Sequence, residues 1–199
     1  MHSKYKINSV TRGHGLLEGF LAKKRSLMAN KLLENAPKEK VLDIGCGSYP
    51  YFLLNTDFKE KIGIDYSLRK LSIKDLELKK LDVTKKRLPF KDNNFDAVTM
   101  LAVFEHLDKK MLPGVLEEIR RVLKKNGVLI ITTPSPWVDK PLHHLANFGI
   151  ISKEEIHEHK HNLNHKTIGQ YLINAGFPKS KLKKGYFEVH MNMWFVSQK

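Results

Sequence analysis

The sequence has very little cysteine and no long apolar run. Its single cysteine, Cys46, has no second cysteine to pair with, so a disulfide within the chain is excluded and a reducing compartment is expected. No stretch approaches the roughly 20 apolar residues of a membrane-spanning helix. The first residues also lack the apolar region of a secretory signal. These absences predict a cytoplasmic protein without a membrane span.

Acidic side chains are also scarce relative to basic ones. The chain has 35 Lys and Arg against 21 Asp and Glu, which gives a formal net charge of +14. Such an excess favours anionic partners, such as nucleic acid, phosphorylated metabolites or anionic lipid headgroups, without choosing among them. A lysine-rich surface is often only a solvated face. At 199 residues the chain can bury a normal core, and we expect one domain over residues 1–199.

One short stretch organises the rest of the chain. Residues 41–44 are typical of a buried strand, and Gly45, Cys46 and Gly47 follow it directly. Glycines at this point let the backbone turn sharply and approach a ligand that a side chain would block. Asp43 lies just before them, where its carboxylate can accept hydrogen bonds from an amine or a hydroxyl. The alternative interpretation is a tight strand-to-helix turn that binds nothing.

Two further strand patterns follow the glycine loop. Residues 61–65 are typical of a second strand that ends in a carboxylate, and residues 79–83 are typical of a third strand. An acidic residue about twenty positions beyond the glycines is where a Rossmann-like fold holds the ribose hydroxyls of a nucleotide. Asp65 fits this role. The alternative is that Asp65 caps a helix beginning near Ser67.

A distinctive connection leads into the fourth strand. Leu-Pro-Phe at residues 88–90 is followed by Asn-Asn-Phe-Asp at residues 93–96 and by an apolar strand at residues 97–101. With the glycine loop and the acidic strand ends, residues 40–134 resemble the class I S-adenosylmethionine-dependent methyltransferases of the broad type 11-like domain family. The resemblance implies an α/β fold with a Rossmann-like, doubly wound sheet of seven strands. This sheet is mostly parallel, with an antiparallel C-terminal hairpin and a preceding N-terminal helix. One departure is Tyr49, which stands where many family members have a third glycine.

The resemblance also implies the cofactor, S-adenosylmethionine, and the residues that bind it. Asp65 would accept hydrogen bonds from the ribose, and Tyr66 would lie against the adenine. Asp82 and Val83 would meet the adenine amino group and ring face, and the backbone of Leu101 would contact the methionine moiety. The implied cofactor-binding residues are Asp43, Gly45, Cys46, Gly47, Asp65, Tyr66, Asp82, Val83 and Leu101.

The segment before the first strand is predicted to cap the site. Apolar residues recur near helical spacing between Gly15 and Ala36, which predicts an amphipathic helix. In the family this position packs over the cofactor and substrate, so residues 1–37 are expected to form a cap. His14 at its start would then contact the substrate. The alternative for His14 is an ordinary surface histidine.

The Glu105-His106 pair follows the fourth strand, where residues line the reacting end of the cofactor. In ubiquinone-biosynthesis O-methyltransferases and small-RNA terminal 2′-O-methyltransferases, a similar pair binds a divalent ion with a glutamate three residues earlier. Here that position is Ala102, so we expect no metal site. His106 is predicted to accept the proton of a substrate hydroxyl, with Glu105 contacting the substrate. The alternative is that His106 bonds only to the protein.

The next elements are predicted in outline. A helix is expected at residues 112–123, with residues 124–127 as its basic last turn and stop, and a fifth strand at residues 128–133. Residues 134–166 are predicted to form a substrate-side insertion, in which the resemblance implies that His161, or alternatively His159, contacts the substrate. The other histidines of this insertion lack the cysteines and the defined spacing of a metal site.

A helix and two strands are predicted to complete the sheet. The helix is expected at residues 167–177, and the strands at residues 186–189 and 191–196. A turn is expected at Gly185. Lysines on either side of this turn would form a solvated sheet edge, which also discourages pairing with another chain.

These patterns support four functional hypotheses. The leading one is a methyltransferase that acts on an oxygen of a small or medium-sized metabolite, such as a sugar, a lipid-linked molecule or a quinone-like acceptor. The alternative is an RNA- or protein-modifying methyltransferase that uses the basic surface, although no separate RNA-binding module is visible. A nicotinamide-dependent oxidoreductase is disfavoured, because an acidic residue precedes Gly-x-Gly and a helix precedes the first strand. A non-catalytic cofactor-binding module is the fourth hypothesis.

Overall fold

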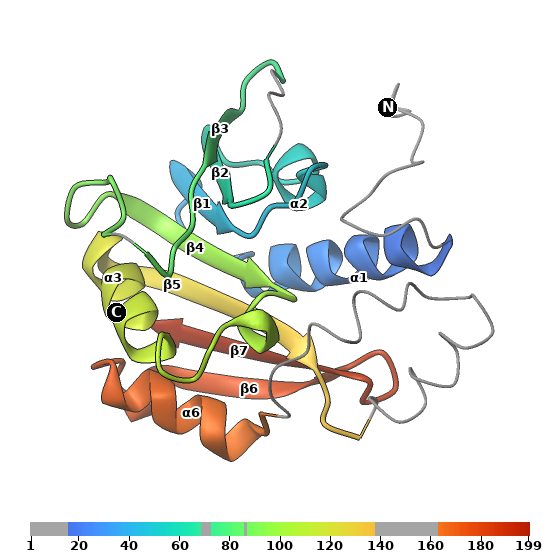
Figure 1. Cartoon of the computed structure of the whole chain (residues 1–199), viewed down its shortest axis with the longest axis vertical. Helices are drawn as coiled ribbons and strands as arrows, with labels where there is room; N and C mark the ends of the chain where they lie inside the picture. Colours follow the sequence, from blue (N-terminus) through green and yellow to red (C-terminus); the bar gives the residue numbers. More distant parts are fainter. Residues whose placement is uncertain (1–15, 69–72, 86, 138–162) are drawn as a thin grey trace.

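The computed structural model describes residues 16–68, 73–85, 87–137 and 163–199, and Figure 1 shows how they are arranged. In chain order the elements are α1 (Leu16–Leu32), β1 (Lys40–Ile44), α2 (Tyr51–Leu54), β2 (Glu60–Asp65), β3 (Glu77–Lys80), β4 (Phe95–Leu101), η1 (Phe104–His106), α3 (Leu112–Val122), β5 (Leu123–Pro134), α6 (His165–Asn174), η2 (Lys179–Lys181), β6 (Leu182–Phe187) and β7 (Asn192–Gln198). None of the described helices is long and apolar enough to cross a bilayer.

The strands form one sheet in the order β3-β2-β1-β4-β5-β7-β6 (Figure 1). The pairs among β1 to β5 are parallel, and β7 runs antiparallel to both β5 and β6. The predicted seven-stranded sheet with an antiparallel C-terminal hairpin is therefore confirmed. The chain moves outward from β1 to β3 and restarts at β4 on the other side of β1, so the switch point lies between β1 and β4. Doubly wound sheets bind ligands at this point, beyond the carboxyl ends of the strands.

Helices cover both faces of the sheet. α1 contacts β4 and β5 on one face, where Val41 and Ala97 belong to the buried cluster. α3 and α6 cover the other face, where Leu42 and Val98 belong to the second cluster. Adjacent residues of one strand thus face opposite sides, as the pleat requires. The central strands are apolar on both sides, which is typical of a parallel sheet between two helical layers.

α1 confirms the predicted helix before the first strand but buries less apolar surface than expected. It ends at Leu32, before the predicted end at Ala36. Leu33, just beyond the helix, is fully buried, whereas Phe20 is 52% exposed. The ring of Phe20 lies near Lys24, whose Nζ is 5.2 Å from the ring centroid. The apolar stripe that the helical spacing indicated is therefore buried at the end nearest β1 and partly solvated at Phe20.

The third strand ends earlier than predicted. β3 stops at Lys80, so Asp82 and Val83 follow the strand and do not lie within it. The carboxylate of Asp82 accepts hydrogen bonds from the backbone N–H and the hydroxyl of Thr84, at 2.9 and 2.7 Å. Such local bonds form a turn in place of the strand ladder.

The boundary between α3 and β5 also differs from the prediction. Residues 124–127 lie within β5, so they are not the last turn of the helix. The basic residues of that turn are Arg120 and Arg121. Leu123 already has an extended backbone and pairs with Phe95 of β4. Strand pairing therefore ends the helix before the lysines and the glycine that the sequence suggested as its stop.

The C-terminal hairpin turns at a different place than predicted. Gly185 lies inside β6 opposite Trp194, and a Cβ at Gly185 would come within 2.6 Å of the indole. Glycine is thus required there by the close approach of a ring and not by a turn. The turn lies further on, where Glu188, Val189 and His190 all have positive φ.

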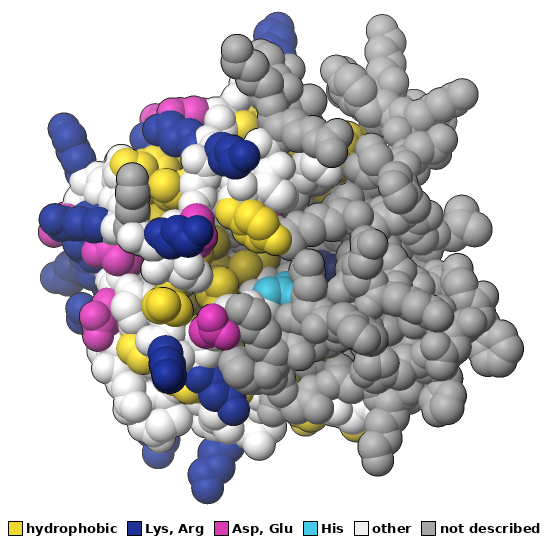
Figure 2. All heavy atoms as spheres, viewed as in Figure 1, with side chains coloured by type: hydrophobic (Ala, Val, Ile, Leu, Met, Phe, Trp, Pro, Cys, Tyr) yellow, Lys and Arg dark blue, Asp and Glu magenta, His cyan; other side chains and the backbone are white. Residues whose placement is uncertain are grey.

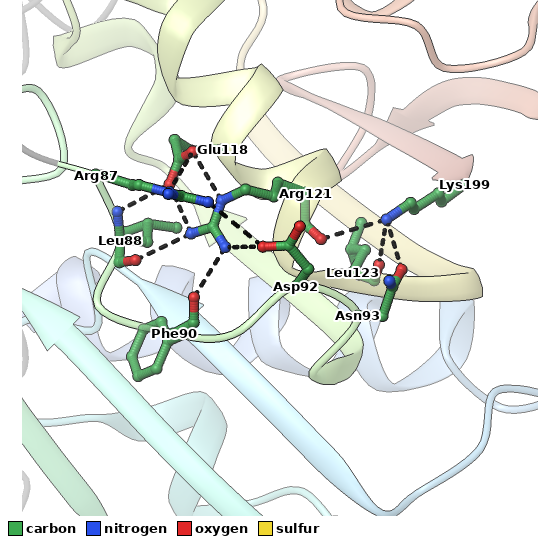
Figure 3. A network of polar contacts seen from close by, with 9 residues as sticks. All are labelled: Arg87, Leu88, Phe90, Asp92, Asn93, Glu118, Arg121, Leu123 and Lys199. Carbon is green, nitrogen blue, oxygen red and sulfur yellow. Dashed lines mark hydrogen bonds and ion pairs between the residues drawn. The ribbon is translucent and has the colours of Figure 1, made fainter.

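Arg121 of α3 anchors the connection that precedes β4 (Figure 3). Its guanidinium donates to the backbone oxygens of Leu88 and Phe90, at 3.0 and 2.9 Å. It also pairs with Asp92 at 2.6 Å and with Glu118 at 2.8 Å, and its side chain is only 15% exposed. The Leu-Pro-Phe connection is therefore fixed to α3 at the amino ends of the strands.

Candidate functional site

The glycine loop leaves the carboxyl end of β1 with a left-handed backbone. Gly45 and Gly47 have φ values of +74° and +69°, a region that residues with a Cβ rarely adopt. A Cβ at Gly45 would also overlap the side chain of Val103. The backbone N–H groups of Gly45 and Cys46 both donate to the oxygen of Ile64 in β2, at 2.7 and 3.3 Å. The loop is thus held against the end of the neighbouring strand.

Asp43 lies directly before this loop and is almost completely buried, with 4% of its surface exposed. The hydroxyl of Thr99 in β4 donates to its Oδ1 at 2.6 Å. Burial raises the pKa of the Asp43 carboxyl from 3.8 to about 7, the Thr99 hydrogen bond lowers it, and the charge of Asp65 raises it again. Two carboxyl groups therefore lie near each other at the switch point of the sheet.

Asp65 ends β2 and connects the glycine loop to the next turn. Its Oδ2 accepts from the N–H of Gly47 at 3.1 Å. Its Oδ1 accepts from the N–H and the hydroxyl of Ser67, at 2.8 and 2.6 Å. The bond to the Ser67 amide is the kind expected if Asp65 caps a helix that begins near Ser67. The bond to Gly47 places the same carboxylate at the glycine loop. The ribose role of Asp65 stays a prediction.

The other residues implied for the nucleotide lie around the same strand ends. The N–H of Leu81 donates to the backbone oxygen of Asp65 at 3.1 Å, which brings the segment of Asp82 and Val83 beside β2. Hydrogen bonds from Thr84 hold the pKa of Asp82 below its usual range. Tyr66 is 53% exposed. Leu101 ends β4 and is half-buried.

Cys46 packs behind the glycine loop. Its thiol is buried and lies 3.6 Å from the backbone oxygen of Gly47. A Cβ at Gly63 would come within 2.8 Å of the sulfur, so the thiol occupies space that a glycine in β2 leaves open. Burial, followed by the charges of Asp43 and Asp65, raises the pKa of the thiol well above its usual range. Cys46 therefore packs against β2, in surroundings that disfavour the thiolate.

The acceptor side begins where β4 ends. Ala102 has a φ of +56°, and its N–H donates to the oxygen of Thr132 in β5 at 2.9 Å, which turns the chain into η1. Glu105 is 4% exposed, and its Oε2 has no hydrogen-bond partner among the described residues. His106 is half-buried, and its N–H donates to the oxygen of Val103 at 3.0 Å. Glu105 and His106 thus both lie just beyond the strand that carries Leu101.

The structure does not describe two predicted substrate residues and most of one predicted segment. His14 and His161 lie outside the described residues, as does most of the predicted insertion at residues 134–166. In the part of the chain that the structure describes, no group of three or more His, Cys, Asp or Glu side chains is placed to hold a metal ion.

Thr99 is the site residue that sequence reasoning missed. It lies in β4 between Val98 and Met100 and is fully buried. A hydroxyl in a strand that is apolar on both faces is the signal that could have identified it, since a buried hydroxyl needs a hydrogen-bond partner. Its partner, Asp43, is 56 residues away in the sequence.

Comparison with known proteins finds methyltransferase domains among the similar sequences. Residues 42–131 match the family described as "Methyltransferase domain". An uncharacterized protein of Methanocaldococcus jannaschii is 41% identical over 101 residues, which cover 51% of this chain and 43% of that protein. Phosphoethanolamine N-methyltransferase 3 of Arabidopsis thaliana is 28% identical over 164 residues, which cover 73% of this chain and 30% of that protein. The chain thus matches less than half the length of either relative.

A solved structure resembles almost the whole of this fold. An S-adenosylmethionine-dependent methyltransferase from Archaeoglobus fulgidus superposes with a TM-score of 0.69 at 20% identity, over 90% of this chain and 94% of that chain. This likeness shows the fold. Residues 42–131, which match the methyltransferase domain family, span this fold from β1 into β5.

The chemistry of the described residues suits S-adenosylmethionine as the cofactor. S-adenosylmethionine presents an ammonium group and two ribose hydroxyls, which all donate hydrogen bonds. Asp43 and Asp65 supply buried carboxyl oxygens at neighbouring strand ends. Gly45 and Gly47 have no side chains, so the backbone of the glycine loop can lie close to the cofactor. Every predicted cofactor-binding residue lies within the matched segment 42–131.

Proposed function

We propose that this protein transfers the methyl group of S-adenosylmethionine to a hydroxyl oxygen of a small or medium-sized metabolite, such as a sugar, a lipid-linked molecule or a quinone-like acceptor. The observation that carries the proposal is the position of Glu105 and His106 in η1, directly beyond β4. On the other side of the switch point, Asp43 is the next-to-last residue of β1 and Asp65 is the last residue of β2. A cofactor held by these two residues would have its reacting end toward η1.

The proposal assigns a role to each group of residues. When bound, S-adenosylmethionine supplies a methyl group that the sulfonium sulfur already activates. The protein then has mainly to align the acceptor, and alignment provides about 7 to 11 kcal/mol in well-oriented reactions. Asp43, Asp65 and the glycine loop bind the cofactor. His106 accepts the proton of the acceptor hydroxyl, which adds about 10²- to 10⁴-fold to the rate.

Glu105 supports an acceptor that donates a hydrogen bond. A buried carboxylate oxygen without a partner is costly, and a donor on the acceptor would recover that cost. A hydroxyl meets this requirement, and so does an amine. The relative named phosphoethanolamine N-methyltransferase specifies a nitrogen acceptor. An amine-bearing metabolite is therefore the second candidate that this site favours.

The charge distribution ranks a metabolite above a nucleic acid. On the face in Figure 2, Lys and Arg side chains are interspersed with Asp and Glu, and hydrophobic side chains gather near the centre beside a histidine. A partly apolar surface with a few ionisable groups suits a small acceptor better than a phosphate backbone. The RNA-modifying alternative requires salt-dependent binding of bulk RNA. Gel-shift titrations at two salt concentrations would test that requirement directly.

The decisive experiment is transfer of a labelled methyl group. The protein is incubated with methyl-labelled S-adenosylmethionine and fractionated cell extract, and the labelled product is analysed by mass spectrometry for the methylated atom. A small O-methylated product supports the proposal, and an N-methylated one supports the second candidate. Cofactor binding by calorimetry without any labelled product would favour the non-catalytic module.

A further inference from the structure

Thr99 has two hydrogen-bond acceptors within reach. In the parallel pairing of β1 with β4, Thr99 lies directly opposite Asp43. Its Oγ1 is 2.6 Å from Asp43 Oδ1 and 3.5 Å from the backbone oxygen of Leu42. A hydroxyl has one hydrogen to donate and lone pairs that accept. Thr99 can therefore donate to either neighbour, but not fully to both at once.

The groups that act on Asp43 mostly oppose its charge. Burial has the largest effect and raises its pKa, and the nearby charge of Asp65 raises it further. The buried thiol of Cys46 supplies no opposing charge, because burial and the charges of Asp43 and Asp65 raise its pKa. Among these influences the hydroxyl of Thr99 is the one that favours the charged form of Asp43.

We propose that Thr99 is a positioning residue for the cofactor, and that its hydroxyl changes its donor direction with the protonation of Asp43. In the acid form, the Asp43 carboxyl donates to Thr99 Oγ1, and Thr99 donates to the oxygen of Leu42. When the ammonium group of the cofactor binds, the Asp43 proton passes to the solvent, and Thr99 donates to the resulting carboxylate. The inference rests on the proposed function, because it requires a cationic ligand beside Asp43.

The switch couples cofactor binding to proton release. Below a pH of about 7, a proton on Asp43 competes with the ammonium group, so affinity falls by up to about tenfold for each unit of acidification. Thr99→Val keeps the shape of the side chain but cannot donate. Loss of a hydrogen bond to a charged group corresponds to about one to two pKa units. The acid limb, the fall of affinity at low pH, should therefore begin about one to two pH units higher in Thr99→Val. Thr99→Ser should keep the acid limb of the wild type.

The test is calorimetric binding of S-adenosylhomocysteine, which carries the same ammonium group, between pH 5.5 and pH 9. Each titration is run in two buffers with different ionisation enthalpies, because the difference counts the protons released. Wild-type protein and Thr99→Ser should release close to one proton at pH 6. Thr99→Val should lose about five- to fiftyfold in affinity at pH 7 and approach wild type at pH 9.

Thr132 supplies a matched control. It is fully buried in β5, the strand next to β4, and its hydroxyl has no hydrogen-bond partner in the part of the chain that the structure describes. Thr132→Val makes the same change of side chain without touching Asp43, so it should leave the pH profile unchanged. An affinity loss in Thr99→Val that is equal at every pH would overturn the proposal, since packing alone would explain it. An acid limb identical to wild type would overturn it as well.

A measurement on the ligand-free protein separates this inference from the proposed function. Failure of wild-type protein to bind S-adenosylhomocysteine would contradict the cofactor role of the site. Carbon-13 NMR of aspartate carboxyls, with Asp43→Asn to assign the signal, follows the proton on Asp43 directly. Its titration midpoint should rise in Thr99→Val and stay at the wild-type value in Thr132→Val. An unchanged midpoint in Thr99→Val would overturn the proposal whatever the ligand does.

Discussion

The two ends of the sheet hold their buried acidic side chains in opposite settings. At the amino end, Asp96 of β4 accepts from Lys124 Nζ at 2.9 and 3.0 Å and from the backbone N–H of Lys40 at 2.8 Å. At the carboxyl end, Asp43 has a neutral hydroxyl as its hydrogen-bond donor and a second carboxylate nearby. A fixed cation thus neutralises the buried acid at one end, whereas the acid at the other end faces further negative charge.

The pKa shifts follow the same division. Hydrogen bonds from Arg121 hold the pKa values of Glu118 and Asp92 below their usual range. Burial raises the pKa of Asp43 to about 7. Acids that are already paired contribute to folding, whereas a raised carboxyl pKa in a cleft is typical of a functional site. We therefore expect substitutions at the amino end to lower stability and those at the carboxyl end to change binding or rate, with Asp43 also changing how stability depends on pH.

The largest effect is expected at His106. If it accepts the acceptor proton, His106→Ala should lower the maximal rate by about 10²- to 10⁴-fold, while cofactor affinity hardly changes. Steady-state kinetics with the identified acceptor, together with calorimetric cofactor binding, would measure both. His106→Gln is the matched control, because it keeps a polar side chain without a base. Near-normal turnover in both variants would show that the base lies elsewhere.

The next effect concerns the amino end, at Arg121. Arg121→Ala removes a donor from Glu118 and from the backbone oxygens of Leu88 and Phe90, so the free energy of unfolding should fall by about 3 to 5 kcal/mol. Urea denaturation would measure it. Arg87→Ala is the control, since this guanidinium belongs to the same network but is 69% exposed, and it should cost about 1 kcal/mol or less. A loss of cofactor affinity in folded Arg121→Ala would break the division between the two ends.

Asp43 should make the ligand-free protein less stable as pH rises. Its pKa is about 7 when folded, against 3.8 as a free side chain, so the folded state binds the additional proton between these values. Stability from this group is therefore present below pH 4 and lost as pH rises through 7, by up to about 4 kcal/mol. Asp43→Asn should remove this slope and gain relative to wild type at pH 8. Urea denaturation of the two proteins at pH 5 and pH 8 would measure it. An equal change of midpoint in both proteins between these pH values would contradict the prediction.

The smallest effect is expected at Asp65. Asp65→Ala should weaken S-adenosylhomocysteine binding by about 10- to 150-fold, because a hydrogen bond to a charged group contributes about 1.5 to 3 kcal/mol. Calorimetry would measure it. Ser67→Ala removes the local partners of Oδ1 only in part and keeps the carboxylate, so it should bind almost normally. An equal loss in both variants would mean that Asp65 acts by holding the turn and not by accepting from the ribose.

Features that depend on a few adjacent residues were predictable from the sequence. The alternation of apolar strands and glycines indicated β1, β4 and β5, and the family resemblance gave their order in the sheet. Gly45 and Gly47 were expected to turn sharply, and both have positive φ. The details of β3 and of the C-terminal turn were not predictable in the same way. Asp82 bonds to Thr84, a local turn that competes with the strand pattern. Gly185 makes room for Trp194 of the neighbouring strand, a partner that spacing alone cannot identify.

The sequence by itself determined the fold class and the position of the nucleotide loop, because glycine conformation and the burial pattern of a strand are local properties. Only the tertiary structure decided which side chains meet. Arg121 reaches residues about 30 positions away, at Leu88 and Phe90, and Thr99 reaches Asp43 across 56 positions. These contacts follow from strand register and helix docking, which bring distant residues into one buried site. The electrostatic difference between the two ends of the sheet arises from the same distant contacts.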